Sequence, residues 1–262
     1  MTDLQTTETT QYGRTRINLR AGEVEGFVIL PAEGGRGGRP WLWYAPSFMR
    51  DPYPLPKDLH AWYLQPVLES GIAVAGVDVG ESWGSPAGRA LFTRFHALVT
   101  ERFGLDRRAC LMPQSRGGLM HYNWAAEHPD CVRCIGAIYP VCDMKRPIRL
   151  EKVAAAYGLT PGQLLAEAHL HHPIDRVAPL AEHRVPILHI HGDQDEVVPL
   201  ASNSQALIDR YRALGGPGEV IVVAGKGHAE VPEFFQNRRM LEFYLTLGEN
   251  LGPEGRCGAE TP

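Results

Sequence analysis

The feature that most constrains this chain is a sharp turn between an apolar strand and a helix. The apolar run 109–112 leads through Pro113 and Gln114 to Ser115, and Gly117 and Gly118 precede a helix-like stretch over 119–127. Two glycines remove the side chains that would crowd such a turn. The free N–H groups at a helix start favour negative charge on a nearby oxygen. We therefore interpret Ser115 as a candidate nucleophile, with an ordinary loop serine as the alternative.

Two further polar segments follow apolar strands in the same way. The run 186–190 is strand-like and is followed by Asp193, Asp195 and Glu196, and the strand-like run 219–224 is followed by His228. Serine, carboxylate and histidine thus occur in this order, each after a strand. Because parallel strands end at one edge of a sheet, we expect these side chains to meet there.

At these residues the chain resembles the α/β-hydrolase superfamily, whose nucleophile elbow is G-x-S-x-G and whose triad runs Ser, Asp/Glu, His. The resemblance covers about residues 14–248 and includes His-Gly-x-x-Asp-x-x-Val-Pro over 191–199. The Ser-x-Gly-Gly string is also similar to the catalytic part of prolyl-oligopeptidase-like proteins. One departure is Pro113, which occupies the first glycine of the elbow. A small residue is normal there because the turn is tight.

The order of apolar runs indicates alternating strands and helices. We expect an α/β protein with the three-layer α/β-hydrolase fold, in which a mostly parallel twisted sheet carries helices on both faces. Strands are predicted over 14–19, 23–30, 41–45, 72–79, 110–114, 134–141, 186–190 and 219–224, and helices over 58–70, 89–103, 119–127, 202–214 and 231–247.

The chain length fits a single domain, which we place at residues 12–250. Residues 144–184 interrupt the alternation with two amphipathic segments, 150–157 and 161–170. By the resemblance, we expect a short helical cap over the site. A long surface excursion is the alternative. Residues 1–11 and 252–262 read as flexible tails.

Composition excludes several functions. The net charge of −4 arises from interspersed acids and bases, which argues against nucleic-acid or anionic-membrane binding. No long apolar run or signal peptide is present, so we expect a cytoplasmic protein. The histidines at 169, 171 and 172 could bind a metal, but no acidic or thiol side chains stand at ligand spacing. We therefore expect no metal and no organic cofactor.

The resemblance assigns roles to the polar residues. Ser115 would form an acyl-enzyme, His228 would act as general base and then acid, and Asp195 would orient the imidazole. Asp143, at the end of an earlier strand, remains a possible substitute for Asp195. His191 precedes the glycine of its motif and is interpreted as structural.

The same resemblance indicates an oxyanion hole formed by backbone N–H groups. One donor would be Arg116, directly after the nucleophile, and the other Ser47, with Phe48 as the alternative. We also expect Met49, Glu81 and Trp83 to line the substrate pocket. Arg50 and Arg116 either bind a substrate carboxylate or pair with acids of the protein.

These features predict a serine hydrolase that cleaves carboxylic esters, with a small acyl or carbohydrate ester as its partner. A serine peptidase or amidase of prolyl-oligopeptidase-like type is an alternative, disfavoured because no propeller domain that would restrict access to peptides is seen in the 262 residues. A further alternative is a non-catalytic scaffold of this fold that binds a ligand.

Overall fold

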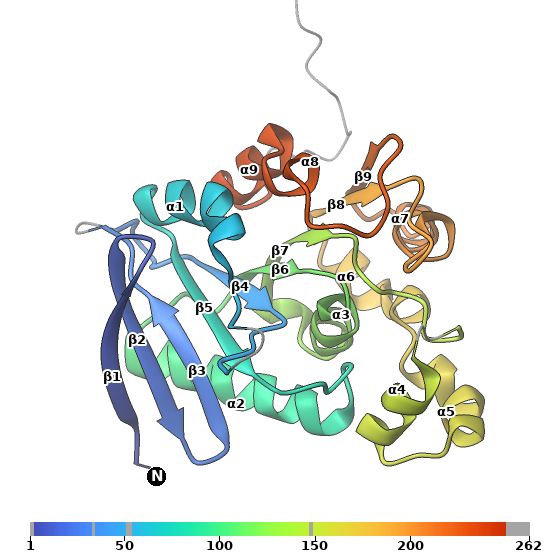
Figure 1. The fold of residues 1–262 in the computed structure, drawn as a ribbon, viewed down its shortest axis with the longest axis horizontal. Helices are drawn as coiled ribbons and strands as arrows, with labels where there is room; N and C mark the ends of the chain where they lie inside the picture. Colours follow the sequence, from blue (N-terminus) through green and yellow to red (C-terminus); the bar gives the residue numbers. More distant parts are fainter. Residues whose placement is uncertain (1–2, 33–34, 51–53, 147–148, 250–262) are drawn as a thin grey trace, which may run out of the picture.

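A nine-stranded sheet forms the centre of the molecule (Figure 1). The computed structural model describes residues 3–32, 35–50, 54–146 and 149–249. The order across the sheet is β1-β2-β3-β5-β4-β6-β7-β8-β9. The strands are β1 (Gln5–Gln11), β2 (Arg14–Ala21), β3 (Val24–Ile29), β4 (Trp41–Ala45), β5 (Ala73–Asp78), β6 (Ala109–Pro113), β7 (Val132–Ile138), β8 (Ile187–Gly192) and β9 (Gly218–Val223).

The strands from β5 to β9 in this order run parallel, whereas β1, β2 and β3 form an antiparallel meander that joins β5. The central strands β4, β6 and β8 are buried at every residue, as near-continuous apolar runs covered on both faces must be. The predicted mostly parallel α/β sheet is confirmed.

Strand β1 differs from the expectation of a flexible segment over 1–11. Residues 5–11 pair with β2 along their whole length, from Gln5 opposite Arg20 to Gln11 opposite Arg14. Tyr12 and Gly13 both have positive φ, which suits a two-residue hairpin turn. The prediction was wrong here because an edge strand held by its backbone ladder, with mostly exposed side chains, needs no apolar face. The second predicted tail, 252–262, lies outside the described residues.

Helices cover both faces of the sheet, which completes the predicted three layers (Figure 1). One core contains side chains of α1, α8 and α9, and a second, on the other face, contains side chains of α2, α3, α6 and α7. The helices are α1 (Ala61–Glu69), α2 (Pro86–Phe103), α3 (Gly117–Glu127), α6 (Ala178–Glu182), α7 (Ser204–Ala213), α8 (Pro232–Phe235) and α9 (Arg238–Leu245), with short 3₁₀ turns at Asp58–His60, Pro129–Cys131, Ala168–Leu170, Pro173–Arg176 and Leu200–Ser202.

Local sequence signals fix the ends of these helices. In α2 the Ser85 hydroxyl accepts a hydrogen bond from the Gly88 N–H, and Pro86 occupies the first turn, where no N–H partner is needed. The predicted helix over 231–247 is divided into α8 and α9. Asn237 caps α9 by accepting from the Met240 N–H, and this starts a new helix.

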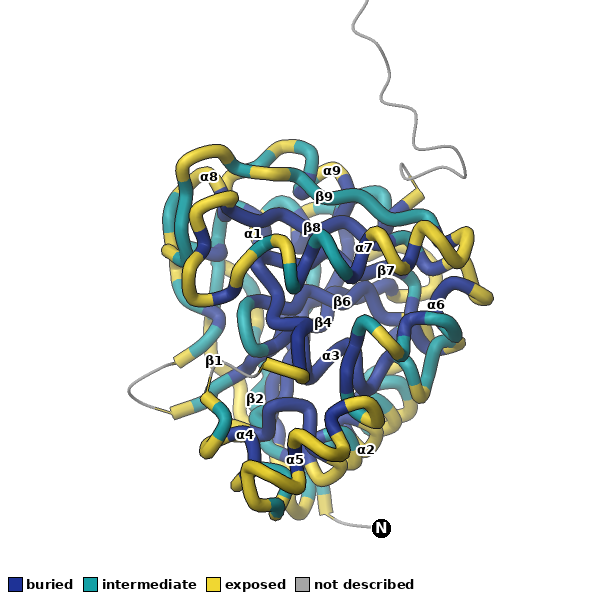
Figure 2. The backbone as a smooth tube through the Cα atoms, turned by 90° about the vertical axis from the view of Figure 1, so that its right-hand side faces the viewer, coloured by how far each residue is buried: buried dark blue, intermediate teal, exposed yellow. Residues whose placement is uncertain are grey.

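The insertion 144–184 carries α4 (Leu150–Tyr157) and α5 (Pro161–Glu167). Thr160 and Gln163 form a capping box at the start of α5. The insertion packs beside α3, in an apolar cluster that includes Leu119, Val153 and Leu164. Figure 2 shows the central strands buried and the outer turns of α5 exposed. Residues 147–148 are outside the described part.

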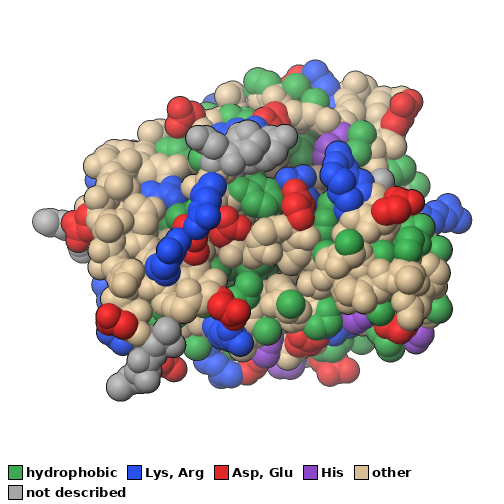
Figure 3. Space-filling view, turned by 60° about the horizontal axis from the view of Figure 1, so that its bottom comes forward, with side chains coloured by type: hydrophobic (Ala, Val, Ile, Leu, Met, Phe, Trp, Pro, Cys, Tyr) green, Lys and Arg blue, Asp and Glu red, His purple; other side chains and the backbone are tan. Residues whose placement is uncertain are grey.

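Surface charge follows the sequence expectation on the face shown in Figure 3, where acidic and basic side chains are interspersed. Within the described residues, we find no helix of the length and apolar character needed to cross a bilayer.

Candidate active site

Ser115 lies two residues after the end of β6, in a conformation that few non-glycine residues adopt, with a φ of 49°. Its N–H donates to the carbonyl of Ile138 at 3.0 Å, and the Gln114 N–H donates to the carbonyl of Ala45 at 2.9 Å. The carbonyl of Ser115 accepts from the Val141 N–H at 2.8 Å. Backbone groups on β4 and near the end of β7 therefore hold the strained turn in place.

The two glycines after the serine are required by close packing. A Cβ atom at Gly117 would lie 2.1 Å from the carbonyl oxygen of Ala45, and one at Gly118 would lie 2.5 Å from that of Val141. Pro113 is the last residue of β6 and pairs with Ala45, so the departure from glycine falls on a strand position without positive φ. The turn is compatible with proline at this place.

A hydrogen-bonded chain joins Ser115 to two side chains from distant loops. The Oγ atom of Ser115 is 2.9 Å from Nε2 of His228, and Nδ1 of His228 is 2.8 Å from Oδ2 of Asp195. An ionised carboxylate only accepts, so Nδ1 carries the proton and Nε2 accepts from the serine hydroxyl. The tyrosine ring of Tyr139 packs against the imidazole, with 4.4 Å between ring centroids.

Asp195 is fully buried and bonded on both oxygens. Its Oδ1 accepts from the N–H groups of Val197 and Val198 at 3.0 and 2.7 Å, and its Oδ2 faces His228 and, at 3.3 Å, Nε2 of His191. Burial alone would raise the pKa of Asp195, but the hydrogen bonds from His191, His228 and Val198 outweigh it and hold the pKa well below its ordinary value. The carboxylate therefore stays ionised.

The acid and base loops are bonded directly to each other. The Gln194 N–H donates to the carbonyl of Lys226 at 3.0 Å, and the Asp193 carboxylate accepts from the Gly225 N–H at 2.7 Å. Gly192 lies so close that a Cβ atom there would be 2.0 Å from the Lys226 oxygen. Asp193 thus joins the two loops, and Asp195 is free to face the histidine.

The other candidate acids lie elsewhere. The Oδ1 atom of Asp143 accepts from the N–H groups of Lys145 and Arg146 at 2.9 and 3.1 Å, which makes this side chain a turn former. Glu196 is exposed to solvent. Of the carboxylates considered from the sequence, the structure brings Asp195 to His228.

The sequence predicts the second oxyanion donor in the segment after β4, at Ser47 or Phe48. Ser47 is buried, and its hydroxyl donates to the Tyr44 carbonyl at 2.7 Å, so its side chain is engaged away from Ser115. The Arg116 N–H has no acceptor in the described part of the chain, whereas the next two N–H groups bond to Gln114 and Ser115. The Arg116 guanidinium stacks over Phe48 at 5.0 Å.

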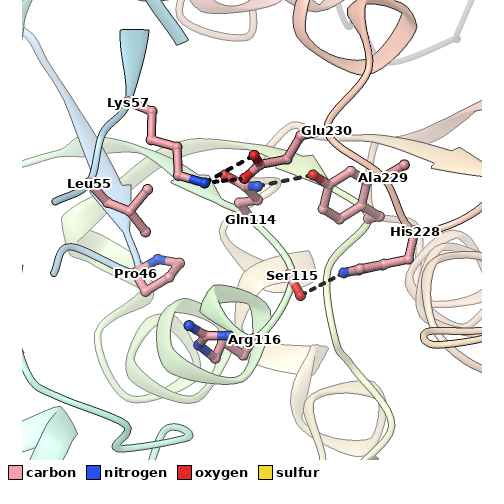
Figure 4. A pocket seen from close by; sticks show the side chains of 10 residues that line it. Pro46, Leu55, Lys57, Gln114, Ser115, Arg116, His228, Ala229 and Glu230 are labelled. Carbon is pink, nitrogen blue, oxygen red and sulfur yellow. Dashed lines mark hydrogen bonds and ion pairs between the residues drawn. The ribbon is translucent and has the colours of Figure 1, made fainter. Parts of the chain in front are cut away.

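A pocket of about 190 Å³ opens beside Ser115 (Figure 4). Across it, Nζ of Lys57 is 3.1 and 3.0 Å from the two carboxylate oxygens of Glu230. Gln114 lies beneath this pair and donates to the Tyr139 hydroxyl at 3.0 Å. The lining residues are Pro46, Leu55, Lys57, Gln114, Ser115, Arg116, Tyr139, His228, Ala229 and Glu230.

The residues expected in the pocket lie outside this lining. Trp83 is buried in the cluster beneath the insertion, because its backbone turns at a φ of 50° before α2. Met49 packs against the core and donates its N–H to Asp78, and Glu81 forms an ion pair of 3.0 Å with Arg116. The described residues of the insertion, 144–146 and 149–184, also contribute nothing to the lining, contrary to the expectation of a cap over the site.

Sequence reasoning did not find the pocket walls. Glu230 follows His228 by two residues, and this spacing was an available signal. Lys57 carried no signal, because it lies 173 residues from its partner. Arg50, considered as a substrate ligand, pairs with Glu25 at 2.8 Å.

The described residues include no group of three histidine, cysteine or acidic side chains placed to hold a metal ion. In the histidine cluster of the insertion, Nδ1 of His172 accepts from the Met144 N–H at 3.0 Å, and the His171 ring packs on Tyr157. Both rings thus have structural contacts.

Comparison with known proteins places this geometry in context. A model of the prolyl oligopeptidase family matches residues 82–249. A search of curated protein sequences found no match. Among solved structures, a puromycin-hydrolyzing peptidase of Mycobacterium tuberculosis is 18% identical with a TM-score of 0.69, and the match covers 96% of this chain and 40% of that one. This chain thus spans about two fifths of that peptidase's length.

Two shorter proteins match over nearly their whole length. An S-formylglutathione hydrolase of Agrobacterium tumefaciens is 14% identical with a TM-score of 0.66, and the match covers 94% of this chain and 99% of that one. Est1E of Butyrivibrio proteoclasticus is 16% identical with a TM-score of 0.59, at coverages of 94% and 97%. At such identities the likeness shows the fold. Because the family model matches well over half of the sequence, this chain belongs to the prolyl oligopeptidase family, whose fold is that of the α/β-hydrolases.

Proposed function

We propose that this protein is a serine hydrolase that cleaves carboxylic esters, with Ser115 as nucleophile, His228 as general base and Asp195 as the acid of the triad. The observation that carries the proposal is the continuous chain of hydrogen bonds, 2.9 Å from Ser115 to His228 and 2.8 Å from His228 to Asp195. All three side chains follow the carboxyl ends of parallel strands, where ligands of this fold class bind.

The geometry gives each atom a task. Oγ of Ser115 forms a bond to the ester carbonyl carbon while its proton passes to Nε2 of His228. The carbonyl oxygen gains negative charge, which the N–H of Arg116 and that of Ser47, with Phe48 as the alternative, would stabilise. When the C–O bond to the alcohol breaks, the proton returns from His228 to the leaving alkoxide. Water then repeats the sequence and releases the acid.

The pocket beside Ser115 supports a small substrate. Its apolar walls, Pro46, Leu55 and Ala229, end at the Lys57–Glu230 pair, whose side chains are 39% and 41% exposed. An apolar chain that reaches this pair would have to displace water from two charges. We therefore propose short acyl or carbohydrate esters, in keeping with the full-length match to an S-formylglutathione hydrolase.

A peptidase or amidase is the second candidate. It is favoured by the family assignment and by the puromycin-hydrolyzing peptidase among the structural matches. The same triad would serve, because an amide differs from an ester only in the leaving group that His228 must protonate.

The test is a p-nitrophenyl ester series, from acetate to decanoate, beside aminoacyl p-nitroanilides, on the wild type and on Ser115→Ala. We expect the wild type to hydrolyse the short esters and Ser115→Ala to lose several powers of ten in kcat while it stays folded. Anilide turnover that exceeds ester turnover would favour the peptidase. No turnover, together with no labelling of Ser115 by a fluorophosphonate, would favour a ligand-binding scaffold.

A further inference from the structure

Asp195 is linked to a chain of buried polar side chains that extends away from the pocket. His191 Nδ1 is 2.7 Å from the Ser204 hydroxyl, which is 2.9 Å from Nδ1 of His189. Nε2 of His189 is 2.5 Å from the hydroxyl of Tyr122 on α3. All four side chains are buried, at 0% or 1% exposure.

The partners fix the proton positions along this chain. Nε2 of His191 is 2.7 Å from the carbonyl oxygen of Val198, which only accepts, so Nε2 carries the proton and also faces Oδ2 of Asp195. Nδ1 of the neutral ring then accepts from Ser204. Ser204 in turn accepts from Nδ1 of His189, and Nε2 of His189 accepts from Tyr122.

The opposite direction leaves a buried proton without a partner. If His191 were a cation that donated from both nitrogens, Ser204 would donate to His189, and His189 would donate to Tyr122. The Tyr122 proton would then have no acceptor within the described residues. Burial lowers the pKa of His189 to about 3 and raises the pKa of Tyr122, so both side chains are neutral. Every donor in the chain therefore points toward His191, whose protonated Nε2 lies 2.7 Å from the Val198 carbonyl oxygen and 3.3 Å from Oδ2 of Asp195.

We propose that His191 is a positioning residue for the triad: Ser204 holds it in the tautomer that donates to Asp195, so that the carboxylate is fixed in position and its charge is shared between His191 and His228. The inference rests on the proposed function, because it assigns no reaction of its own. The titratable groups that face His191 and Asp195 are His189, His228, Tyr122 and Tyr139.

Two consequences follow for the reaction. Without the donor from His191, Asp195 would be held by fewer bonds and would align the imidazole less well, which lowers kcat rather than substrate binding. The whole charge of the Asp195 carboxylate would also act on the His228 imidazolium, so this base would keep its proton to higher pH. The acid limb of the pH–rate profile should therefore shift to higher pH.

The experiment compares His191→Leu, His191→Gln and Ser204→Ala with the wild type. Its readouts are kcat and KM for the best p-nitrophenyl ester and the pH dependence of fluorophosphonate labelling, which needs no natural substrate. Gln places an amide N–H where His191 carries Nε2. His121→Leu is the matched control, since His121 is a buried histidine whose two ring nitrogens bond to nothing in the described residues.

We expect His191→Leu to lose roughly ten- to a hundredfold in kcat, as loss of an orienting partner does at other sites, with KM within about twofold and the acid limb higher by about half a pH unit or more. Ser204→Ala should show a smaller change of the same kind, and His191→Gln should recover most of the rate. His121→Leu should behave as the wild type.

The inference is overturned if folded His191→Leu keeps the wild-type rate and acid limb, if His121→Leu loses as much, or if His191→Gln loses as much as His191→Leu. Should His191→Leu not fold, an unchanged rate and acid limb in Ser204→Ala overturns it. Failure of the proposed function is distinct: in that case Ser115→Ala retains the turnover of the wild type, or the wild type is not labelled at all.

Discussion

The ion pair that ends the pocket should set the length of the acyl group. We expect the double change Lys57→Met with Glu230→Gln to extend the range of p-nitrophenyl esters that are cleaved. Both replacements keep much of the shape of the original side chain and remove its charge. The pair is about two-fifths exposed, so its loss should cost under about 1 kcal/mol of stability after screening by solvent, and the fold should survive.

The magnitude follows from burial of methylene groups. Each buried CH₂ contributes about 0.8 kcal/mol, which is about fourfold in kcat/KM. In the wild type this gain should stop where the chain meets Lys57 and Glu230. If the double variant admits two more methylenes, the gain is about 1.6 kcal/mol, or about fifteenfold on the longer esters.

The assay is kcat/KM for acyl chains from acetate to decanoate, each plotted as a ratio of variant to wild type. A second ion pair provides the control, because Lys226 and Glu233 are 2.6 Å apart, 37% and 44% exposed and outside the pocket lining. Lys226→Met with Glu233→Gln should leave the ratio flat. A flat ratio in the Lys57 and Glu230 variant as well, with turnover retained, would refute this account of the pocket.

Three further predictions concern the site and the core. The pKa of Asp195 is lower in the folded than in the unfolded protein, so the ionised carboxylate stabilises the fold above about pH 4, and this contribution is lost as the pH falls further. The Tm advantage of the wild type over Asp195→Asn should therefore shrink below about pH 4. The same variant should lose about 10⁴ in kcat. Gly117→Ala should abolish fluorophosphonate labelling, because its Cβ would lie 2.1 Å from the Ala45 oxygen, whereas Gly162→Ala, with open space around its Cβ, should label normally. Burial lowers the pKa of His121 from 6.5 to about 3, so between these pH values the unfolded chain binds a proton that the folded protein does not, and the wild type loses stability as the pH falls. His121→Leu lacks this group, so its free energy of unfolding, measured with urea from pH 6.5 to 3, should fall less than that of the wild type.

The order of the elements was predictable because apolar runs alternate regularly with amphipathic ones. The hairpin strand β1 was not, since its side chains are polar and its stability comes from backbone pairing with β2. The break between α8 and α9 was also missed, because Asn237 was read as part of one helix.

The approach of Ser115, Asp195 and His228 was predictable from their places after successive strands. Pocket walls were harder, because they depend on contacts between segments far apart in sequence. Trp83 is an example. An aromatic residue near a site is expected to line the pocket, but the backbone conformation of Trp83 directs its side chain into the apolar cluster beside α3. No local pattern pairs Lys57 with Glu230.

The bonds between the acid and base loops have a mechanical consequence. Asp195 and His228 follow the last two strands, β8 and β9, and their loops are hydrogen-bonded to each other, whereas Ser115 follows β6 and is anchored to β4 and to the end of β7. The histidine and the aspartate are therefore aligned with each other by contacts that do not involve the serine. The hydrogen bond between Ser115 and His228 is the triad contact that crosses between the two groups, so the alignment of the nucleophile depends on how β8 packs against β7.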